Sequence, residues 1–350
     1  MAAYILRRIL LIVPTLLGIM LLNFVIIQFA PGGPVEQILS ELEAEAGESG
    51  QTTGGAGAYR GRQGIDPELI AELEAQFGLD KPVHERFLLM IWNYARFDFG
   101  ESFQRAEPVI DIILEKMPVS ISLGLWATLI AYAVSIPLGI RKAVRDGTPF
   151  DTATSGLIIA AYALPGFLVP VVLLVMFAGG SYLQWFPLRG LGSDGIEEMS
   201  ILAQMGDYFW HIALPVFAMT ISGFATITLL TKNSFLDEIR KQYVMTARAK
   251  GLSERRVLYG HVFRNAMLIV VSTLPAAFVG IFMTGSIFVE TVFSLDGLGL
   301  LGFESVKNRD YPVVLGTLYL FGLIGLVVKL ISDLVYVWID PRIDFEAREG

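Results

Sequence analysis

The stretch Tyr243–Asn265, YVMTARAKGLSERRVLYGHVFRN, determines how the rest of the chain is interpreted. It is polar and basic, whereas the whole chain is 54% apolar and only 17% charged, below the roughly one quarter of charged residues usual in soluble domains. The small residues Thr246, Ala247 and Ala249 precede Gly251, and glycine commonly ends a helix in the left-handed conformation. This stretch is therefore predicted to be a helix of soluble character within a membrane protein.

Helix-cap signals lie shortly before this stretch and within it. Ser234, with Asp237 three residues later, forms a capping-box-like pair, so the first helix is expected to begin near residue 234. Ser253 is expected to cap a second helix that runs into the next apolar stretch. A helix that ends in small side chains and a glycine can lie close against another protein. We therefore expect a helix-turn-helix that serves as a contact site.

Long stretches without Asp, Glu, Lys or Arg indicate membrane spans. A bilayer core needs about 20 apolar residues per helix. The third stretch is longer than that, and the sixth continues past Lys329. We predict an all-α integral membrane protein with six transmembrane helices, in 9–35, 117–140, 152–188, 208–231, 265–289 and 311–328.

Basic residues near the membrane ends predict the orientation. They flank the first two spans, at Arg7, Arg8, Arg141, Lys142 and Arg145. Loop 232–264 holds eight Lys and Arg against three Asp and Glu, whereas residues 31–116 hold seven basic and sixteen acidic residues. Both termini and loop 232–264 are therefore predicted to be cytoplasmic, and the long first loop to be external.

The external loop is expected to have internal organisation. Residues 41–64 are rich in Glu, Gly and Ser with almost no large apolar side chains, and are expected to be flexible. One helix is expected over 66–78, with aspartate as cap and proline at its first position. A second helix, over Val83–Phe97, carries aromatic residues suited to a membrane interface.

The predicted organisation has four parts. They are the cytoplasmic N-terminus with the first helix (1–30), the periplasmic loop with its insert and two helices (31–117), the five-helix transmembrane core that includes the cytoplasmic coupling loop 232–264 (118–340), and a cytoplasmic C-terminal tail (341–350).

The stretch 243–265 resembles the coupling loop of importer-type ABC permeases. That pattern is Glu-Ala-Ala, three residues, Gly, nine residues and Ile-x-Leu-Pro. Here Met-Thr-Ala at 245–247 replaces the first element, Gly251 keeps the glycine, and His-Val-Phe-Arg at 261–264 replaces the last. The form TARAKGLSE…HxxRNA resembles that of the peptide/nickel branch of these permeases.

Three further blocks extend the resemblance over nearly the whole chain. They are FGLDKPVHERFLLMIWNYARFDFGES (77–102), GSIFVETVFSLDGLGLLGFESVKNRDYPVVLGTL (285–318) and SDLVYVWIDPRIDF (332–345). Asp296 stands where tryptophan and proline are more usual. The long insert before the first block resembles the Yej-type branch, permeases for peptides and microcin C.

The resemblance implies the type I permease fold of ABC importers and a place in the bacterial inner membrane. It implies the permease subunit of an ATP-driven importer for oligopeptides or peptide-like solutes, microcin C-like peptides among them, that forms half of the pathway. Implied partners are a second related permease, cytoplasmic ABC ATPases, a periplasmic or lipid-anchored substrate-binding protein and the lipid bilayer, with no nucleic acid. The residues it implies for ATPase coupling are Asp237, Tyr243, Thr246, Ala247, Arg248, Ala249, Lys250, Gly251, Arg264 and Asn265.

No enzymatic activity and no cofactor are expected on this chain. It contains no Gly-Lys pair, so it has no phosphate loop of the form G-x-x-x-x-G-K-[ST]. ATP and Mg are therefore expected on the partner ATPase. The absence of cysteine excludes disulfides and cysteine-based metal sites.

Two other function classes were weighed: a secondary, ion-coupled transporter and an intramembrane hydrolase. Ion-coupled transporters keep ionisable groups at mid-membrane, whereas here Glu290, His211, Lys329 and Asp333 are all expected at membrane interfaces. Asp333 is expected to pair with Lys329 one helical turn away. A serine hydrolase would need Ser181 and His211 to face each other within the bilayer, and both are expected near the outer surface.

Overall fold

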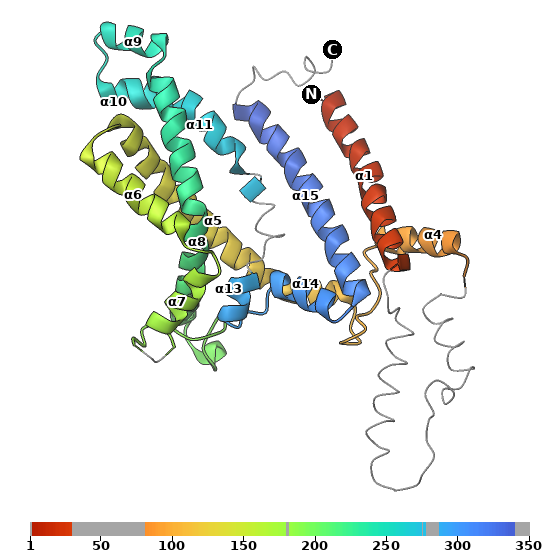
Figure 1. Cartoon of the computed structure of the whole chain (residues 1–350). Coiled ribbons are helices and arrows are strands. Elements are labelled where there is room, and N and C mark those ends of the chain that lie inside the picture. The colour runs from red at the N-terminus through yellow and green to blue at the C-terminus, as the bar shows by residue number, and fades with distance from the viewer. Residues whose placement is uncertain (1, 30–80, 180–181, 275, 278–286, 340–350) are drawn as a thin grey trace, which may run out of the picture. The chain divides into compact units, whose positions relative to one another are not determined.

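The computed structural model describes residues 2–29, 81–179, 182–274, 276–277 and 287–339 (Figure 1). Within these residues the fold is helical, with one isolated antiparallel bridge between Glu101 and Pro108. The predicted insert 41–64, the predicted helix 66–78 and the tail 341–350 lie outside the described residues.

The described residues form the following helices, in chain order. They are α1 (Ala2–Phe29), α4 (Val83–Tyr94), α5 (Val109–Val144), α6 (Pro149–Ala163), α7 (Leu168–Phe177), the 3₁₀ turn η2 (Ile196–Glu198), α8 (Ile201–Ile239), α9 (Gln242–Ala249), α10 (Glu254–Val257), the π-helical turn η3 (Leu258–Val262), α11 (Phe263–Ser272), α13 (Ile287–Val292), α14 (Leu298–Lys307) and α15 (Tyr311–Ile339).

Several of these helices are long and apolar enough to cross a membrane. Three qualify singly, Ile5–Ile26, Val109–Val144 and Tyr311–Val335. Two bent pairs qualify when each is taken as one span: Pro149–Ala163 with Leu168–Phe177, at 98°, and Ile201–Ile221 with Gly223–Ile239, at 49°. The described residues thus hold up to five spans. The remaining predicted span, 265–289, includes residues 275 and 278–286, which lie outside them, so six spans stay a prediction.

The chain forms two compact units. The larger comprises Met1–Ile9, Ile113–Phe303 and Leu323–Gly350, and the smaller comprises Leu10–Ile112 and Glu304–Gly322.

A cluster of buried apolar side chains from α5, α7, α8 and α13 forms the core of the larger unit. We call it the central cluster; it contains Leu123, Ala127, Val169, Ile212, Leu214, Val216, Ala218, Val289, Phe293 and Leu295. Further along the same helices, α5 and α8 approach so closely that a Cβ on Gly139 would lie 2.6 Å from the Cβ of Thr231. Only glycine permits this approach.

Glu290, on α13 beside the central cluster, is fully buried in protein, and its predicted place at a membrane interface stays a prediction. Its carboxylate accepts hydrogen bonds from Ser120 Oγ at 3.2 Å and from the Leu300 N–H at 2.7 Å. Ser120 Oγ in turn accepts from the Leu298 N–H at 2.8 Å. Buried polar groups need such partners, and here the carboxylate finds them on α5 and in the first turn of α14. A sequence pattern does not reveal these nonlocal donors.

One expectation about charged residues is corrected within the larger unit, and Asp296, singled out in the sequence, has a partner there. Asp333 of α15 pairs with Arg8 of α1 at 3.1 Å, and not with Lys329 one turn away. Asp296, in the turn after α13, forms an ion pair with Lys116 of α5.

In the smaller unit, α4 ends at Tyr94, three residues before the predicted end at Phe97. Phe97 has a φ of 60°, which takes it out of the helical conformation. The rings of Tyr94 and Phe99 lie 5.0 Å apart, and those of Tyr94 and Tyr319 lie 5.4 Å apart. Asp310, from the NRDYP block, accepts from Ser102 Oγ at 2.5 Å and fixes the turn after α4.

Candidate functional site

The helix that precedes the candidate site is longer than predicted. Ser234 and Asp237 lie inside α8, which runs to Ile239, so the predicted capping pair was wrong. The Ser234 hydroxyl is buried and donates to the Ala266 carbonyl of α11 at 2.6 Å. Because that nonlocal acceptor satisfies the hydroxyl, the side chain has no capping role. Asp237 is exposed on the last turns of α8.

The next helix, α9, begins at Gln242 after Lys241, and ends as predicted at Gly251. Gly251 has a φ of +80°. Its N–H donates to the Arg248 carbonyl at 2.9 Å, and the Leu252 N–H donates to the Ala247 carbonyl at 3.4 Å. These two bonds form a Schellman motif, which satisfies carbonyl groups that a helix end leaves free.

The second helix begins where the sequence predicted. Ser253 is the N-cap of α10 with extended backbone, although its side chain makes no capping hydrogen bond. The helical path then passes through the π-turn η3 into α11. Such turns are uncommon and are often found at functional sites.

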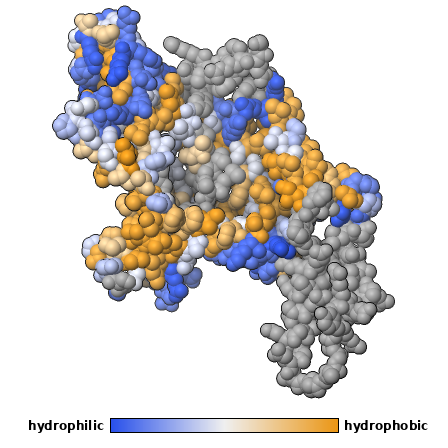
Figure 2. Space-filling view, viewed as in Figure 1, coloured by the Kyte–Doolittle hydropathy of each residue, from blue (hydrophilic) through white to orange (hydrophobic). Residues whose placement is uncertain are grey.

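The two faces of α9 differ sharply in exposure. Val244 and Ala247 are buried, whereas Met245, Thr246 and Ala249 are exposed. Arg248, Lys250, Gly251, Arg264 and Asn265 are exposed as well. Figure 2 shows mostly hydrophilic residues over α9 and α10, next to the hydrophobic surface of α6 to α8. Ala247 therefore lies on the internal face of the helix-turn-helix. The exposed residues named above form its outer face.

The helix-turn-helix has an apolar core shared with the ends of α5, α8 and α11. We call this the cytoplasmic cluster; its buried members are Ile140, Ala143, Phe235, Val244, Ala247, Val257, Val262 and Ala266. Leu252, directly after Gly251, packs against it. α9 and α10 therefore share one apolar core with the ends of these longer helices.

Polar contacts add to this attachment. The Tyr243 hydroxyl donates to Glu238 Oε2 at 2.7 Å and accepts from Asn265 Nδ2 at 3.3 Å, which joins the ends of α8 and α9 to α11. Burial and the Glu238 carboxylate raise the pKa of Tyr243. Arg248 binds Glu254 with two hydrogen bonds, of 2.9 and 3.0 Å, which bridge α9 and α10 across the Gly251 turn.

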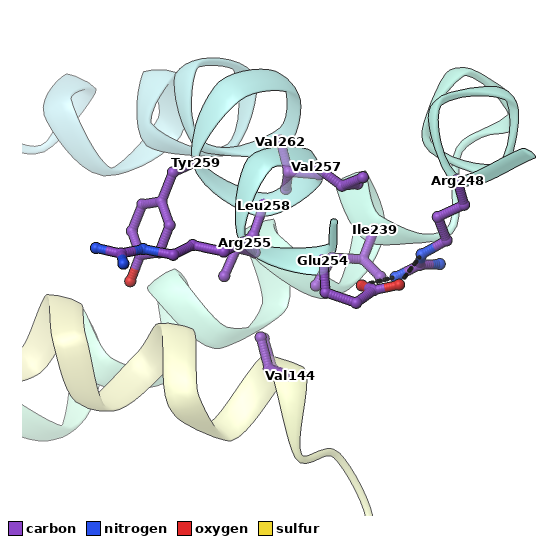
Figure 3. A pocket seen from close by; sticks show the side chains of 10 residues that line it. Val144, Ile239, Arg248, Glu254, Arg255, Val257, Leu258, Tyr259 and Val262 are labelled. Atoms are coloured by element: carbon purple, nitrogen blue, oxygen red, sulfur yellow. Dashed lines mark hydrogen bonds and ion pairs between the residues drawn. The ribbon is translucent and has the colours of Figure 1, made fainter. Parts of the chain in front are cut away.

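A cavity of about 270 Å³ lies beneath this turn (Figure 3). The Arg248–Glu254 pair lies at one end and the side chains of Arg255 and Tyr259 extend together at the other. Its remaining lining is apolar and comes from Ala143, Val144, Ile239, Val257, Leu258 and Val262. These side chains offer packing and charge but no nucleophile paired with a base.

A network of charged side chains joins α5, α6 and α8 just before the helix-turn-helix. Lys142 of α5 is fully buried, and its ammonium group donates to the Asp151 carbonyl at 2.9 Å. It also donates to Thr154 Oγ1 and Ser155 Oγ, both at 2.8 Å, and lies 3.0 Å from Asp151 Oδ1. Lys232 of α8 donates to the other Asp151 oxygen at 2.7 Å. We call these residues the charge network.

The electrostatics of the charge network favour the ionised forms. Hydrogen bonds from Lys232 and Lys142 lower the pKa of Asp151 to about 2, against the opposing effect of burial. Burial alone would lower the pKa of Lys232, but Asp151 and Asp146 raise it above its usual value. Lys232 lies 3.0 Å from Asp146 Oδ1. Asp151 and Lys232 therefore stay charged at neutral pH.

Sequence patterns alone did not predict this network. Lys142 was interpreted only as one of the basic residues that set orientation, and Asp151 was assigned no role. Their pairing depends on the turn between α5 and α6. The one available signal was an aspartate and a lysine placed nine residues apart across a short loop.

The described residues hold no arrangement suited to a metal ion, in that no three of their His, Asp and Glu side chains converge. His211 Nδ1 lies 2.8 Å from the Asp207 carbonyl. Ser181, its proposed partner in a hydrolase, lies outside the described residues.

Comparison with known proteins gives a consistent result. The family model described as "Binding-protein-dependent transport system inner membrane component" matches residues 135–345. The chain is 59% identical over 363 residues to the "Peptidoglycan transport system permease protein YejB" of Agrobacterium fabrum, with all of both chains covered. It is 53% identical over 366 residues to the "Inner membrane ABC transporter permease protein YejB" of Escherichia coli O157:H7, covering 99% of this chain and 100% of the relative. It is 33% identical over 346 residues to the "Oligopeptide transport system permease protein AppB" of Bacillus subtilis, with 99% and 100% covered.

Proposed function

The chain belongs to the family of binding-protein-dependent transport system inner membrane components, and on that premise we propose how it couples transport to ATP. It is a permease subunit of an ABC importer of the peptide transport family. In our proposal, the exposed face of α9 and the turn at Gly251 bind a cytoplasmic ATPase subunit. The ATPase supplies the ATP and Mg chemistry, and this chain supplies the moving helices.

One observation carries the proposal: a basic, exposed helix-turn-helix rests on the ends of three longer helices. Its buried face shares the cytoplasmic cluster with α5, α8 and α11, and its outer face carries Met245, Thr246, Ala249 and Lys250. A push on α9 therefore displaces the three helices together. A motion of this kind would bias a two-state equilibrium between inward-open and outward-open forms.

The proposed architecture extends this to the whole chain. Six spans place both termini and the helix-turn-helix in the cytoplasm and the long first loop in the periplasm. A single chain of this size supplies half of a pathway, so a second, related permease completes it. A periplasmic or lipid-anchored binding protein delivers the substrate.

Peptides or peptide-like solutes are the proposed cargo. The names of the relatives support two versions of this class, oligopeptides and peptidoglycan. A peptidoglycan fragment that carries a stem peptide belongs to both. Uptake of an oligopeptide and of a muropeptide, each in competition with the other, would distinguish them.

Reconstitution in proteoliposomes tests the coupling directly. The chain alone is expected to show neither ATP hydrolysis nor substrate accumulation. Together with its ATPases, sister permease and binding protein, it is expected to accumulate peptide only when ATP is present on the cytoplasmic side. Accumulation by this chain alone, driven by a proton or sodium gradient, would overturn the proposal in favour of a secondary transporter.

The proposed orientation has its own test, because the chain has no cysteine. Single cysteines are introduced at Ser49, in the first loop, and at Ser253, in the helix-turn-helix. A membrane-impermeant thiol reagent on intact cells with a permeabilised outer membrane should label the first and spare the second. The opposite pattern would place the helix-turn-helix outside and remove the coupling argument.

A further inference from the structure

The break between α6 and α7 lies inside a stretch without charged residues. Residues 152–188 contain no Asp, Glu, Lys or Arg. α6 ends at Ala163 and α7 begins at Leu168, and the two axes differ by 98°. Pro165 has no N–H and disfavours helical backbone in the residue before it, and Gly166 follows. The break is therefore encoded in the sequence.

The depth of the break follows from the cytoplasmic end of α6. Asp151 belongs to the charge network, and because charged side chains are rare in the hydrocarbon of a bilayer, we place this network at the membrane interface. From Thr152 to Leu164 a helix rises by about 18 Å, which is less than the roughly 30 Å thickness of a bilayer core. The break therefore lies within the membrane.

Backbone groups at this depth need partners that lipid cannot supply. Across the break, the Leu164 N–H donates to the Ala161 carbonyl at 3.4 Å and the Leu168 N–H to the Pro165 carbonyl at 2.8 Å. The other carbonyl groups in the last turn of a helix accept no hydrogen bond from an N–H group of the same helix. Irregular backbone inside a bilayer is tolerated only where it lines water or is buried in protein. This break must therefore face a water-filled space or another protein.

The residues of the break are exposed, whereas the helix that follows the break is buried at its second residue. Every residue from Tyr162 to Leu168 is exposed, whereas Val169, the next residue, is buried in the central cluster. Tyr162 is 68% exposed and Phe167 52% exposed. The Phe167 ring lies 6.0 Å from that of Phe288 on α13, which is itself 59% exposed. Two aromatic side chains from separate helices thus form an exposed pair next to the break.

We propose that the break, with the Phe167–Phe288 pair, forms part of the pathway wall and contacts the backbone of the peptide in transit. The proposal rests on the proposed function, because it takes the cargo to be a peptide. Carbonyl oxygens at the end of α6 accept hydrogen bonds from peptide N–H groups, and aromatic faces pack against apolar side chains of any sequence. Because the surroundings of the break carry no charge, they do not discriminate between peptides by the charge of their side chains. Recognition of this kind depends on the peptide backbone and is independent of the peptide's sequence.

Cysteine accessibility in the complete importer tests this inference. Tyr162→Cys and Phe167→Cys are placed singly, and labelling of this chain by an impermeant thiol reagent is measured by intact mass. Leu157→Cys is the matched control, because Leu157 is 72% exposed on the same helix and lies about 140° away from Tyr162 around the axis. The two break cysteines should be labelled and the control should not, and saturating transported peptide should abolish labelling at the break.

Each alternative result is informative. Cysteines at the break that resist the reagent and cross-link to the sister permease would show a subunit interface and overturn the proposal. Labelling that peptide does not change would show a water-filled surface that the cargo does not touch, and would also overturn it. Uptake of the same peptide by the wild-type importer is measured in parallel. If that uptake is absent, the proposed function fails, whereas normal uptake with unprotected cysteines refutes the pathway contact alone.

Discussion

The helix-turn-helix and the α6–α7 break differ in how their polar groups are satisfied. Around the helix-turn-helix, buried charges are paired and the helix end is closed by a Schellman motif, over an apolar core. At the break, the backbone hydrogen bonds of Leu164 and Leu168 are local, one at the end of α6 and one at the start of α7, the helix axes bend by 98°, and seven consecutive residues are exposed. The first region is held together by ion pairs and a shared core, as the proposed coupling role requires. The α6–α7 break instead leaves backbone groups and the Phe167 and Phe288 rings available for contact with another molecule.

Removal of the buried lysine should have the largest effect on stability. Lys142→Met leaves the Asp151, Thr154 and Ser155 acceptors without their donor, and loss of one partner of a buried ion pair costs about 3–5 kcal/mol. We expect a clear fall in the melting temperature of the purified importer. Arg141→Met, which removes the same charge from an exposed neighbour, should change stability by no more than about 0.5 kcal/mol. Equal effects of the two variants would contradict the rigidity assigned to this region.

Substitution of the glycine that ends α9 should have the next largest effect. Gly251 has a φ of +80° and no atom within 4 Å of an added Cβ, so the strain in Gly251→Val comes from the backbone alone. That strain costs roughly 1–2 kcal/mol. ATP-driven uptake should fall in Gly251→Val and be largely kept in Gly251→Asn, because asparagine tolerates the left-handed conformation. Similar uptake by both variants would mean that the turn does not position the coupling surface.

Truncation of the exposed aromatic pair should separate transport from stability. Phe167→Ala removes a ring contact worth about 0.5–1.5 kcal/mol at most, since half of the side chain is already exposed. The melting temperature should therefore change little, while peptide uptake shows a raised KM. A large loss of stability with unchanged KM would assign Phe167 to packing and erase the contrast between the two regions.

The Arg248–Glu254 bridge should contribute only a little. Both side chains are largely exposed, at 41% and 73%, and exposed pairs contribute about 0.2–1 kcal/mol. A double-mutant cycle with Arg248→Met and Glu254→Gln measures this coupling energy. A coupling energy well above that range would show that the bridge is part of the rigid frame.

The charge network should be insensitive to pH across the physiological range. Asp151 has a pKa lowered to about 2 from its ordinary value of 3.8, so its stabilising effect is complete above about pH 5 and is lost as pH falls towards 2. The difference in melting temperature between wild type and Asp151→Asn should therefore be constant from pH 6 to pH 8. A difference that shrinks within that interval would indicate an un-ionised Asp151.

Local signals in the sequence predicted the parts of the site that depend on local geometry. Gly251 and Ser253 stand at the predicted helix boundaries because their roles depend on φ and on the next few residues. Ser234 and Lys142 were misjudged or overlooked because their partners, Ala266 and Asp151 with Thr154, are supplied by other helices. The third uncharged stretch was recognised as too long for one span. Pro165 and Gly166 mark the break locally, but its 98° angle depends on how α7 packs into the central cluster.

Cross-linking between α9 and the ATPase tests the central claim most directly. Single cysteines at Thr246 and Ala249, on the exposed face, should form disulfides with a cysteine on the docking surface of the ATPase in the assembled importer. A cysteine at Ala247, between them in sequence but buried in the cytoplasmic cluster, should not. Cross-links at positions 246 and 249 that change in yield when ATP binds would support α9 as the coupling helix. An assembled, transport-active importer in which neither position cross-links would contradict the account.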